Sequence, residues 1–242
     1  MSNDAGACRL RVRYVKEGRL AHLGHLEVMG TVLRSVRRAE LPFEVSEGFA
    51  KRMRIQFSQA LPVGASSVAE YYDLLMPVRL DAQEALDRLK AATPTLLAPQ
   101  EARVLPRRMP ALEAWANRAL WDVDILGEDV TPDAVRDGIE AALQKGTLEF
   151  MRGTKPRTLD LTSTLVSYEL EAISGGADDD GGRGVHTRGV HLGLDTRVTE
   201  RGSLRPAVLI NAVLGRAPNR VCRLSQWHEE RDGSLTSPMS VG

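Results

Sequence analysis

Two histidines and a carboxylate stand close together at the start of a predicted helix. His22 and His25 are three residues apart, with Glu27 close behind. That spacing lets both imidazoles point to nearly the same side, as in metal-binding pairs. The alternative is that they cap or pack the helix, because the sequence offers no third ligand of comparable quality. A metal or acid–base site at these residues therefore stays one alternative, and we predict no cofactor for the chain itself.

Motifs for nucleotide binding and hydrolysis are absent from the sequence. It has no Gly-x-x-x-x-Gly-Lys-Ser/Thr loop, no Gly-x-Gly-x-x-Gly after a strand, and no Gly-x-Ser-x-Gly elbow. The chain has two cysteines, Cys8 and Cys222, so it cannot hold a cluster through three or four thiolates. Independent enzyme chemistry is therefore unsupported by the sequence.

Basic residues cluster near the N-terminus although the whole chain is neutral. It has 32 Lys and Arg against 32 Asp and Glu, but residues 9–60 carry +6 and residues 61–150 carry −6. Arginine suits phosphate because its planar fork donates two parallel hydrogen bonds. The alternative is that these charges are solvated or pair with the acidic segment. The anion-binding candidates here are Arg34, Arg37, Arg38, Lys51, Arg52 and Arg54.

Aromatic residues make up only 5% of the chain, and the Lys/Arg-Gly-Phe/Tyr signature of RNA-binding sheets is absent. Any RNA contact would therefore rest on phosphates and shape more than on base stacking.

Apolar periodicity predicts the elements of the first half. Residues 9–14 alternate as a strand with one buried face, and an apolar stripe predicts a helix over about 20–40. Strands are predicted at 54–58, 71–78 and 96–105, and Asp81 with Glu84 forms a capping box for a helix over 82–92. This order predicts a ferredoxin-like (βαββαβ) α+β half with an antiparallel sheet over residues 9–106.

A second ferredoxin-like half is predicted over residues 117–230, after a linker at 107–116. Strands are predicted at 119–126, 148–152, 165–172, 191–199 and 220–227, one more than the first half has. Thr131 and Pro132 begin a helix that Gly146 ends, and another helix runs over 206–214. Residues 174–189 are predicted to be a flexible loop, and 231–242 a fraying tail.

Location and membrane association follow from what the sequence lacks. No apolar run approaches the ~20 residues that span a bilayer, and the first residues lack the order of a signal peptide. We therefore expect a cytoplasmic protein with no membrane partner.

The N-terminal third carries a linked series of short motifs. They are Arg11–Gly18, His25–Glu27, Arg37–Pro42, Ser46–Phe49, Arg54–Phe57, Leu61–Gly64 and Glu70–Asp73. The series resembles the radical SAM-linked protein family, a domain of unknown function found fused to, or encoded beside, B12-binding-type radical SAM proteins. The resemblance covers about residues 9–80, and Arg157–Asp160 and Gly202–Pro206 look like its later landmarks. It implies a radical SAM protein as partner, which would carry the cluster chemistry.

The chain departs from the family pattern at two places. The family usually has Asn-Pro-His-Pro and a basic residue after Gly-Phe, where this chain has Ala50-Lys51-Arg52-Met53. It also usually has Ser before the histidine of the first helix, where this chain has Gly24. A function of that loop would therefore be altered in this member.

We expect a non-catalytic accessory protein that docks to the radical SAM partner and presents an anionic substrate, with RNA as a candidate, on the basic face of residues 9–54. His25 and Glu27 are predicted polar contacts, Arg37 and Arg38 anion contacts, and Gly48 a turn former. The later landmarks add Arg157, Asp160 and Arg205. Two alternatives are an enzyme acting through His22, His25 and Glu27, and a purely structural interaction module.

Overall fold

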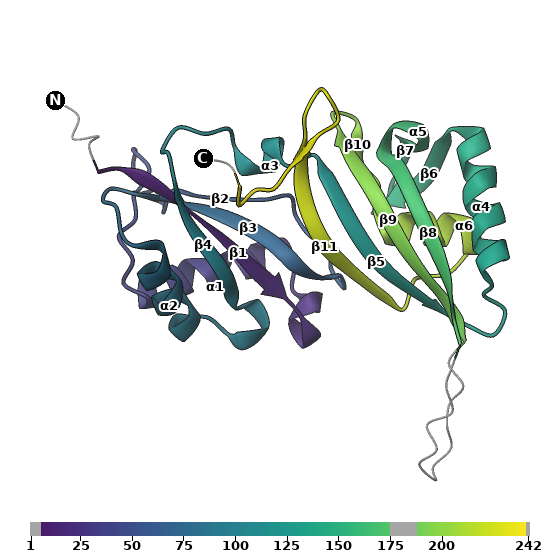
Figure 1. Cartoon of the computed structure of the whole chain (residues 1–242), viewed down its shortest axis with the longest axis horizontal. Coiled ribbons are helices and arrows are strands. Elements are labelled where there is room, and N and C mark those ends of the chain that lie inside the picture. Colours follow the sequence, from purple (N-terminus) through teal and green to yellow (C-terminus); the bar gives the residue numbers. More distant parts are fainter. Residues whose placement is uncertain (1–5, 175–187, 241–242) are drawn as a thin grey trace, which may run out of the picture. The chain divides into compact units, whose positions relative to one another are not determined.

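The computed structural model of the chain describes residues 6–174 and 188–240. They form two compact units, shown in Figure 1: unit 1 is Met1–Asn117 with Ser225–Gly242, and unit 2 is Arg118–Leu224. Each unit combines helices with antiparallel strands, so the predicted α+β class is confirmed. The flexible loop predicted at 174–189 lies almost wholly outside the described residues. Within the described ranges, no helix is long and apolar enough to cross a membrane.

Unit 1 is built on a sheet in which β1 is central. Its elements are β1 (Cys8–Lys16), η1 (Gly18–His22), α1 (His25–Arg38), β2 (Ile55–Phe57), β3 (Ser66–Met76), α2 (Ala82–Ala92), η2 (Thr95–Leu97), β4 (Pro99–Leu105), α3 (Leu112–Trp115), the last part of β11 (Arg220–Glu229) and β12 (Leu235–Thr236). β1 pairs antiparallel with β3 and β4, and β2 pairs with β3. The order β4-β1-β3-β2 is consistent with the ferredoxin-like arrangement.

Helices α1 and α2 cover one face of the unit 1 sheet (Figure 1). Apolar side chains of β1 and β3, among them Leu10, Val12 and Leu74, pack there against the buried stripe of α1. Asp81 caps α2 as predicted, accepting from the amides of Gln83 and Glu84 at 2.9 and 3.0 Å. The Glu84 side chain does not reach back to the cap; it pairs with Arg88 one turn along the helix.

The second face of the unit 1 sheet is also covered, so the prediction of one buried face for residues 9–14 is wrong. Arg9 and Arg11, on that second face, are 4% and 1% exposed. The cover comes from the expected linker and tail: Leu112 and Met239 are buried against β3 residues Ala69 and Tyr71. A strand whose two faces are both covered can carry charge only where that charge is paired.

Unit 2 has a main sheet and a separate hairpin. Its elements are β5 (Arg118–Leu126), α4 (Pro132–Lys145), β6 (Thr147–Arg152), β7 (Lys155–Asp160), α5 (Leu161–Thr164), β8 (Leu165–Ile173), β9 (Gly189–Thr199), β10 (Gly202–Ser203), α6 (Pro206–Leu214) and the first part of β11 (Arg220–Glu229). The main sheet has the order β11-β5-β9, with β8 and β10 also paired to β9. The strand predicted at 148–152 belongs instead to the two-stranded β6–β7 sheet.

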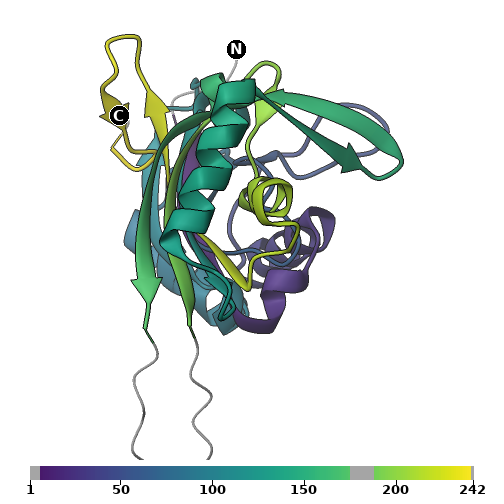
Figure 2. The same ribbon diagram turned by 90° about the vertical axis from the view of Figure 1, so that its right-hand side faces the viewer.

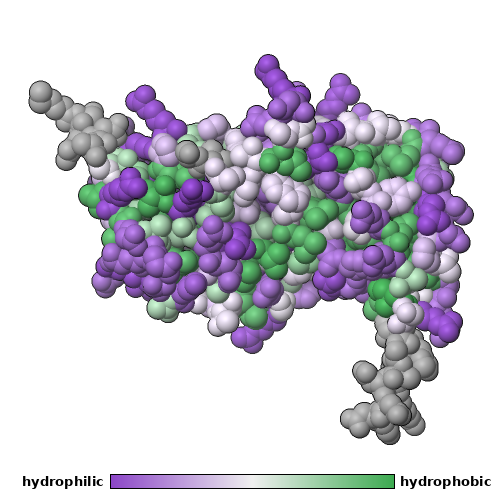
Figure 3. Space-filling view, viewed as in Figure 1, coloured by the Kyte–Doolittle hydropathy of each residue, from purple (hydrophilic) through white to green (hydrophobic). Residues whose placement is uncertain are grey.

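Helices α4 and α6 lie on one face of the unit 2 sheet, and the β6–β7 hairpin extends from the same side (Figure 2). Along β5 and β9, buried residues facing the helices alternate with partly exposed ones. No helix of the described residues packs on the opposite face, where Figure 3 shows hydrophilic and hydrophobic residues interspersed. Thr131 caps α4, and Gly146 ends it at a φ of 72°, as predicted.

Candidate functional site

The arginines of β1 are bound inside unit 1. Asp73 of β3 accepts from Arg11 Nε at 2.7 Å and from Arg11 Nη2 and Arg9 Nη1 at 2.8 Å. Arg9 also donates to the backbone carbonyls of residues 107, 109 and 110. These two guanidinium groups therefore hold the second face of the sheet together and are closed to an external anion.

Other cations of the predicted basic face are also engaged. Arg13 pairs with Glu101 at 3.3 Å, and Arg54 pairs with Glu44 at 3.1 Å. Lys16 is buried, and its Nζ donates to two backbone carbonyls at 2.8 and 2.9 Å. Five of the eleven cations of residues 9–60 are thus engaged within unit 1.

The exposed cations that remain in this segment are Arg19 in η1 and five that lie on α1 and in the loop after it. Arg34, Arg37 and Arg38 are exposed on α1, with Arg34 donating to the Thr31 hydroxyl at 2.9 Å. Arg37 and Arg38 stand in the last turn, where cations stabilise the negative end of the helix. Lys51 and Arg52 are exposed beyond Gly48, which has the predicted turn conformation at a φ of 108°.

The predicted histidine site is not assembled as a metal centre. The Glu27 carboxylate accepts from the Gly24 amide at 2.7 Å, so it serves the start of α1. His25 packs edge-on against Phe57, with 5.8 Å between ring centroids, and His22 is exposed in η1. Among the described residues, one set of side chains is grouped closely enough to hold a metal ion; it lies in unit 2 and includes none of these three residues.

His25 does line a pocket of about 400 Å³ in unit 1. Gln56 and Phe57 stand beside it, so two of the sequence motifs meet here. The opposite wall comes from Leu112 and Glu113, in the segment expected to be a linker. The lining is mostly apolar and offers few polar groups, so the pocket carries no charge suited to an anion.

The strongest cluster of free charge lies in unit 2. Four arginines, Arg152, Arg157, Arg201 and Arg205, line a pocket of about 480 Å³ together with Phe150 and Ser203. We call these four residues and their cavity the arginine pocket. All four residues are exposed to solvent, Arg205 with part of its side chain buried, and none forms an ion pair with a described residue. The arginine pocket thus combines a concave surface with positive charges that no described carboxylate pairs with.

Two parts of the chain supply the four arginines: the β6–β7 hairpin and the segment around β10. The tight turn at Gly153, with a φ of 63°, joins β6 to β7, and Arg157 pairs in register with Phe150. Gly202 has a φ of 137°, and a Cβ there would lie 3.3 Å from a Leu159 methyl carbon, so the β10 segment packs closely on the hairpin. Arg201 precedes this glycine, and Arg205 is the N-cap residue of α6.

The electrostatics of the arginine pocket favour an anionic ligand. Partial burial, and then the charge of nearby Arg152, lower the pKa of Arg205 from its ordinary value. Arginine still stays protonated at neutral pH, so like charges face one cavity. An anion that enters would relieve this repulsion and accept charge-assisted hydrogen bonds.

Asp160 serves the fold beside the arginine pocket. Its carboxylate accepts from the Thr162 hydroxyl at 2.8 Å and from the Ser163 amide at 3.1 Å, which caps α5. These hydrogen bonds lower the pKa of Asp160. Of the three later landmarks, Arg157 and Arg205 reach the pocket, whereas Asp160 ends the strand that carries Arg157.

A second polar cluster, on the uncovered face of unit 2, combines two carboxylates with a histidine and an arginine. His191 lies between Asp122 and Asp124, with contacts of 2.7 and 2.8 Å from its two ring nitrogens. Arg220 binds the same two carboxylates at 2.6 Å each. Burial raises the pKa of Asp124, but the hydrogen bonds from Arg220 and His191 outweigh it and the net pKa is lowered. Since a metal ion here would have to displace Arg220, the arrangement favours an ionic network.

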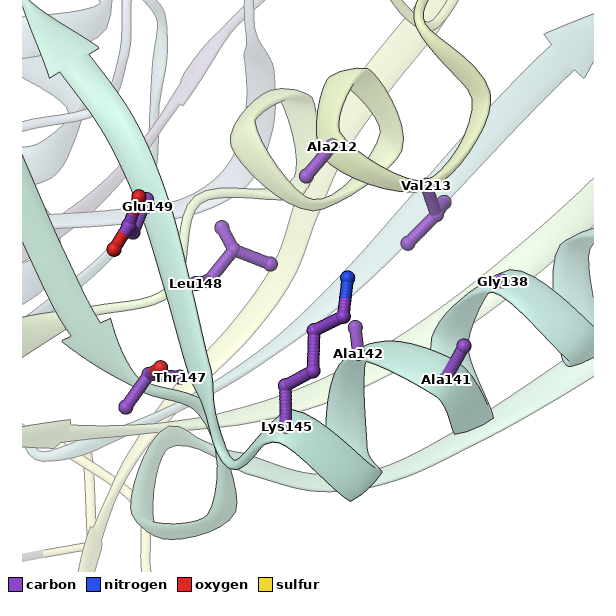
Figure 4. A pocket seen from close by; sticks show the side chains of 9 residues that line it. All are labelled: Gly138, Ala141, Ala142, Lys145, Thr147, Leu148, Glu149, Ala212 and Val213. Atoms are coloured by element: carbon purple, nitrogen blue, oxygen red, sulfur yellow. The ribbon is translucent and has the colours of Figure 1, made fainter.

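The groove between α4, α6 and β6, about 590 Å³, is a helix seam (Figure 4). Small side chains of the two helices line it, and Lys145 projects between them. A Cβ at Gly138 would lie 2.9 Å from the Val213 Cβ, so glycine permits the close helix approach. With one cation and one carboxylate, Glu149, the groove has no net charge.

Sequence reasoning missed part of both unit 2 clusters. Arg152 belongs to no motif that points to an anion, and Arg201 lies one residue before the Gly202–Pro206 landmark; both reach the pocket through the hairpin and the β10 turn. Asp122, Asp124 and His191 come from paired strands, and strand alternation alone places them on one face.

Comparison with known proteins places the chain in a family without assigning a reaction. A family model described as "Uncharacterized protein conserved in bacteria (DUF2344)" matches residues 9–206. The match takes in His25, Gly48 and all four residues of the arginine pocket. No curated protein matches the chain. The link to radical SAM proteins stays a prediction.

Proposed function

The chain belongs to this uncharacterized bacterial family, and we propose that it is a non-catalytic accessory protein that binds RNA as an anionic substrate. The arginine pocket of unit 2 is the proposed contact. Its four exposed arginines without ion-pair partners among the described residues are the observation that carries the proposal.

The proposed main contact is the arginine pocket and not the β1 arginines of the basic face of residues 9–54. Arg9 and Arg11 are buried on Asp73, and Arg54 is paired with Glu44, so that face offers fewer free cations than its composition implies. RNA suits the arginine pocket because its backbone presents successive phosphates to several guanidinium groups at once. Each phosphate that is neutralised releases counterions, which makes such binding salt-dependent.

We also propose that the RNA is presented to a radical SAM protein. This part rests on the motif series of residues 9–80 and on the cysteine count, since two thiols cannot hold the cluster that such chemistry needs. Co-purification from cell extract, with and without RNase, tests it. A radical SAM protein retained after RNase treatment would support direct docking, and its absence from both eluates would refute the partner.

Filter binding of bulk RNA across a salt series tests the arginine pocket. Arg157→Glu should lower affinity at least tenfold at moderate salt and make the salt dependence shallower by about one ion per lost phosphate contact. The matched control is Arg136→Glu, also in unit 2, whose arginine is exposed and pairs with Asp133 outside the pocket. Equal affinities for wild type and Arg157→Glu would rule out the pocket as the RNA contact.

A further inference from the structure

We propose that the loop of residues 45–52 in unit 1 is a second RNA contact, in which Phe49 stacks on an unpaired base and Lys51 and Arg52 hold the flanking phosphates. The inference rests on the proposed function in taking RNA as the substrate. It adds a contact to single-stranded bases, which the low aromatic content of the sequence did not predict.

Backbone hydrogen bonds close the loop at its base. Val45 and Met53 form an antiparallel bridge, and the Ser46 amide donates to the Arg52 carbonyl at 2.8 Å. The Arg52 amide donates back to the Ser46 hydroxyl at 3.0 Å. The loop is therefore a defined projection, and the position of its tip follows from the bridged residues below it.

Phe49 stands at the tip of this loop without cover. Its exposed fraction is 114%, against 80% for Leu26, the next most exposed large apolar residue of the described part of the chain. Gly48 takes a φ of 108° just before it, a conformation that L side chains rarely adopt, and turns the chain at this point. The aromatic ring is thus open to a planar partner.

The charges beside Phe49 fit a nucleic-acid strand. Lys51 and Arg52 are exposed, and neither side chain has an ion-pair partner among the described residues. Glu44, an acidic neighbour at the base of the loop, is already held by Arg54 and Arg107. Only Glu47 opposes the two cations, so the tip carries a net positive charge. An aromatic ring flanked by cations is the usual means of binding single strands without sequence preference.

The surroundings of Phe49 favour a base over a protein partner. Aromatic anchors of protein interfaces tend to sit within a ring of contacts that excludes water. Gly48 precedes Phe49 and Ala50 follows it, and these two small residues supply little surface for such a ring. The next residue on either side, Glu47 or Lys51, is charged. A nucleobase needs only the ring face and the nearby cations, and both are present.

A tryptophan at the tip makes stacking directly observable. Emission from Phe49→Trp should be quenched saturably by oligouridylate, and not by inorganic phosphate at the same phosphate concentration. The wild type, which contains Trp115, Trp121 and Trp227, provides the background. Val63→Trp is the matched control, because Val63 is also exposed in unit 1, at 66%, but its loop lacks flanking cations. Quenching confined to Phe49→Trp is the expected result.

Phe49→Ala measures the contribution of stacking to affinity. Base–aromatic stacking predicts a loss of about 5- to 150-fold, with an unchanged salt slope because no charge is removed. The exposed position predicts an unchanged melting temperature. The inference would be overturned if RNA did not quench the emission of Phe49→Trp, or if Phe49→Ala bound RNA with the affinity of the wild type. The inference would also be overturned if a co-purified protein, and not RNA, quenched the emission of Phe49→Trp.

The two proposals fail separately in these assays. Weaker binding by Arg157→Glu with no effect at Phe49 would leave the arginine pocket and remove the stacking contact. The reverse pattern would leave RNA binding through the loop of unit 1 and remove the arginine pocket. Absence of RNA binding by the wild type would overturn both.

Discussion

Two clusters of arginine in this chain have opposite surroundings. On the second face of the unit 1 sheet, Arg9 and Arg11 are buried and share the carboxylate of Asp73. In unit 2, the four residues of the arginine pocket are exposed and lack ion-pair partners among the described residues. A guanidinium is thus a structural group in one cluster and a free charge in the other.

The difference follows from what faces each cluster. Asp73 lies directly opposite Arg11 in the β1–β3 register, so strand pairing itself brings the opposite charges together. In the β6–β7 hairpin, Arg157 lies opposite Phe150 and Arg152 opposite Lys155, so pairing supplies no carboxylate. The number of basic residues in a segment therefore says less about anion binding than the residues that pair with them.

Asp73→Asn should have the largest effect on stability. The substitution leaves two buried guanidinium groups without their counter-charge, and breaking a buried pair in this way costs about 3–5 kcal/mol. Urea unfolding should show this loss. Glu101→Gln, which removes the exposed partner of Arg13, is the control and should cost less than about 1 kcal/mol. A loss below about 1 kcal/mol in Asp73→Asn would contradict the structural role assigned to Arg9 and Arg11.

Asp124 provides an intermediate case, because its ionic network is partly exposed. Its lowered pKa means that the folded state favours the charged carboxylate more than the unfolded state does. The resulting stability is present above the ordinary carboxyl pKa of about 3.9 and is lost as pH falls below it. Thermal melts between pH 3 and pH 7 should therefore be less acid-sensitive in Asp124→Asn. Parallel curves for variant and wild type would show that the network adds no stability.

Arg152→Gln should leave stability nearly unchanged, in contrast to a change at Arg11. Removing one like charge beside Arg205 should alter the free energy of unfolding by no more than about 0.5 kcal/mol, toward greater stability. Urea titration of Arg152→Gln beside Arg11→Gln makes the comparison direct. A clear destabilisation by Arg152→Gln would mean that this arginine has a partner within the fold.

Gly24→Ser should give the smallest effect. Gly24 is the N-cap of α1 at a φ of −71°, and serine there can accept from a first-turn amide. The expected gain is a few tenths of a kcal/mol, about the known difference between serine and glycine caps. The melting temperature should rise slightly. A fall would show that the Glu27 contact with the Gly24 amide leaves no room for the hydroxyl.

Local signals in the sequence predicted where helices begin better than they predicted what covers the faces of the sheets. Asp81 and Thr131 carry their own capping chemistry, so helices α2 and α4 begin at the predicted residues. The alternation of residues 9–14 correctly indicated a strand, but the cover on its arginine face comes from residues more than 90 positions away. Likewise, Arg157 and Arg205 were indicated by resemblance, while Arg152 and Arg201 depend on how the hairpin meets the β10 turn.

The division of the chain has a consequence for its synthesis. Unit 2 is inserted within unit 1, because β11 passes from Leu224 into residues 225–240, which pack on the first segment. A ribosome therefore completes residues 118–224 before it supplies the residues that cover Arg11 and Tyr71. Unit 2 can fold during translation, while unit 1 must wait for the last part of the cover on one face of β1 and β3.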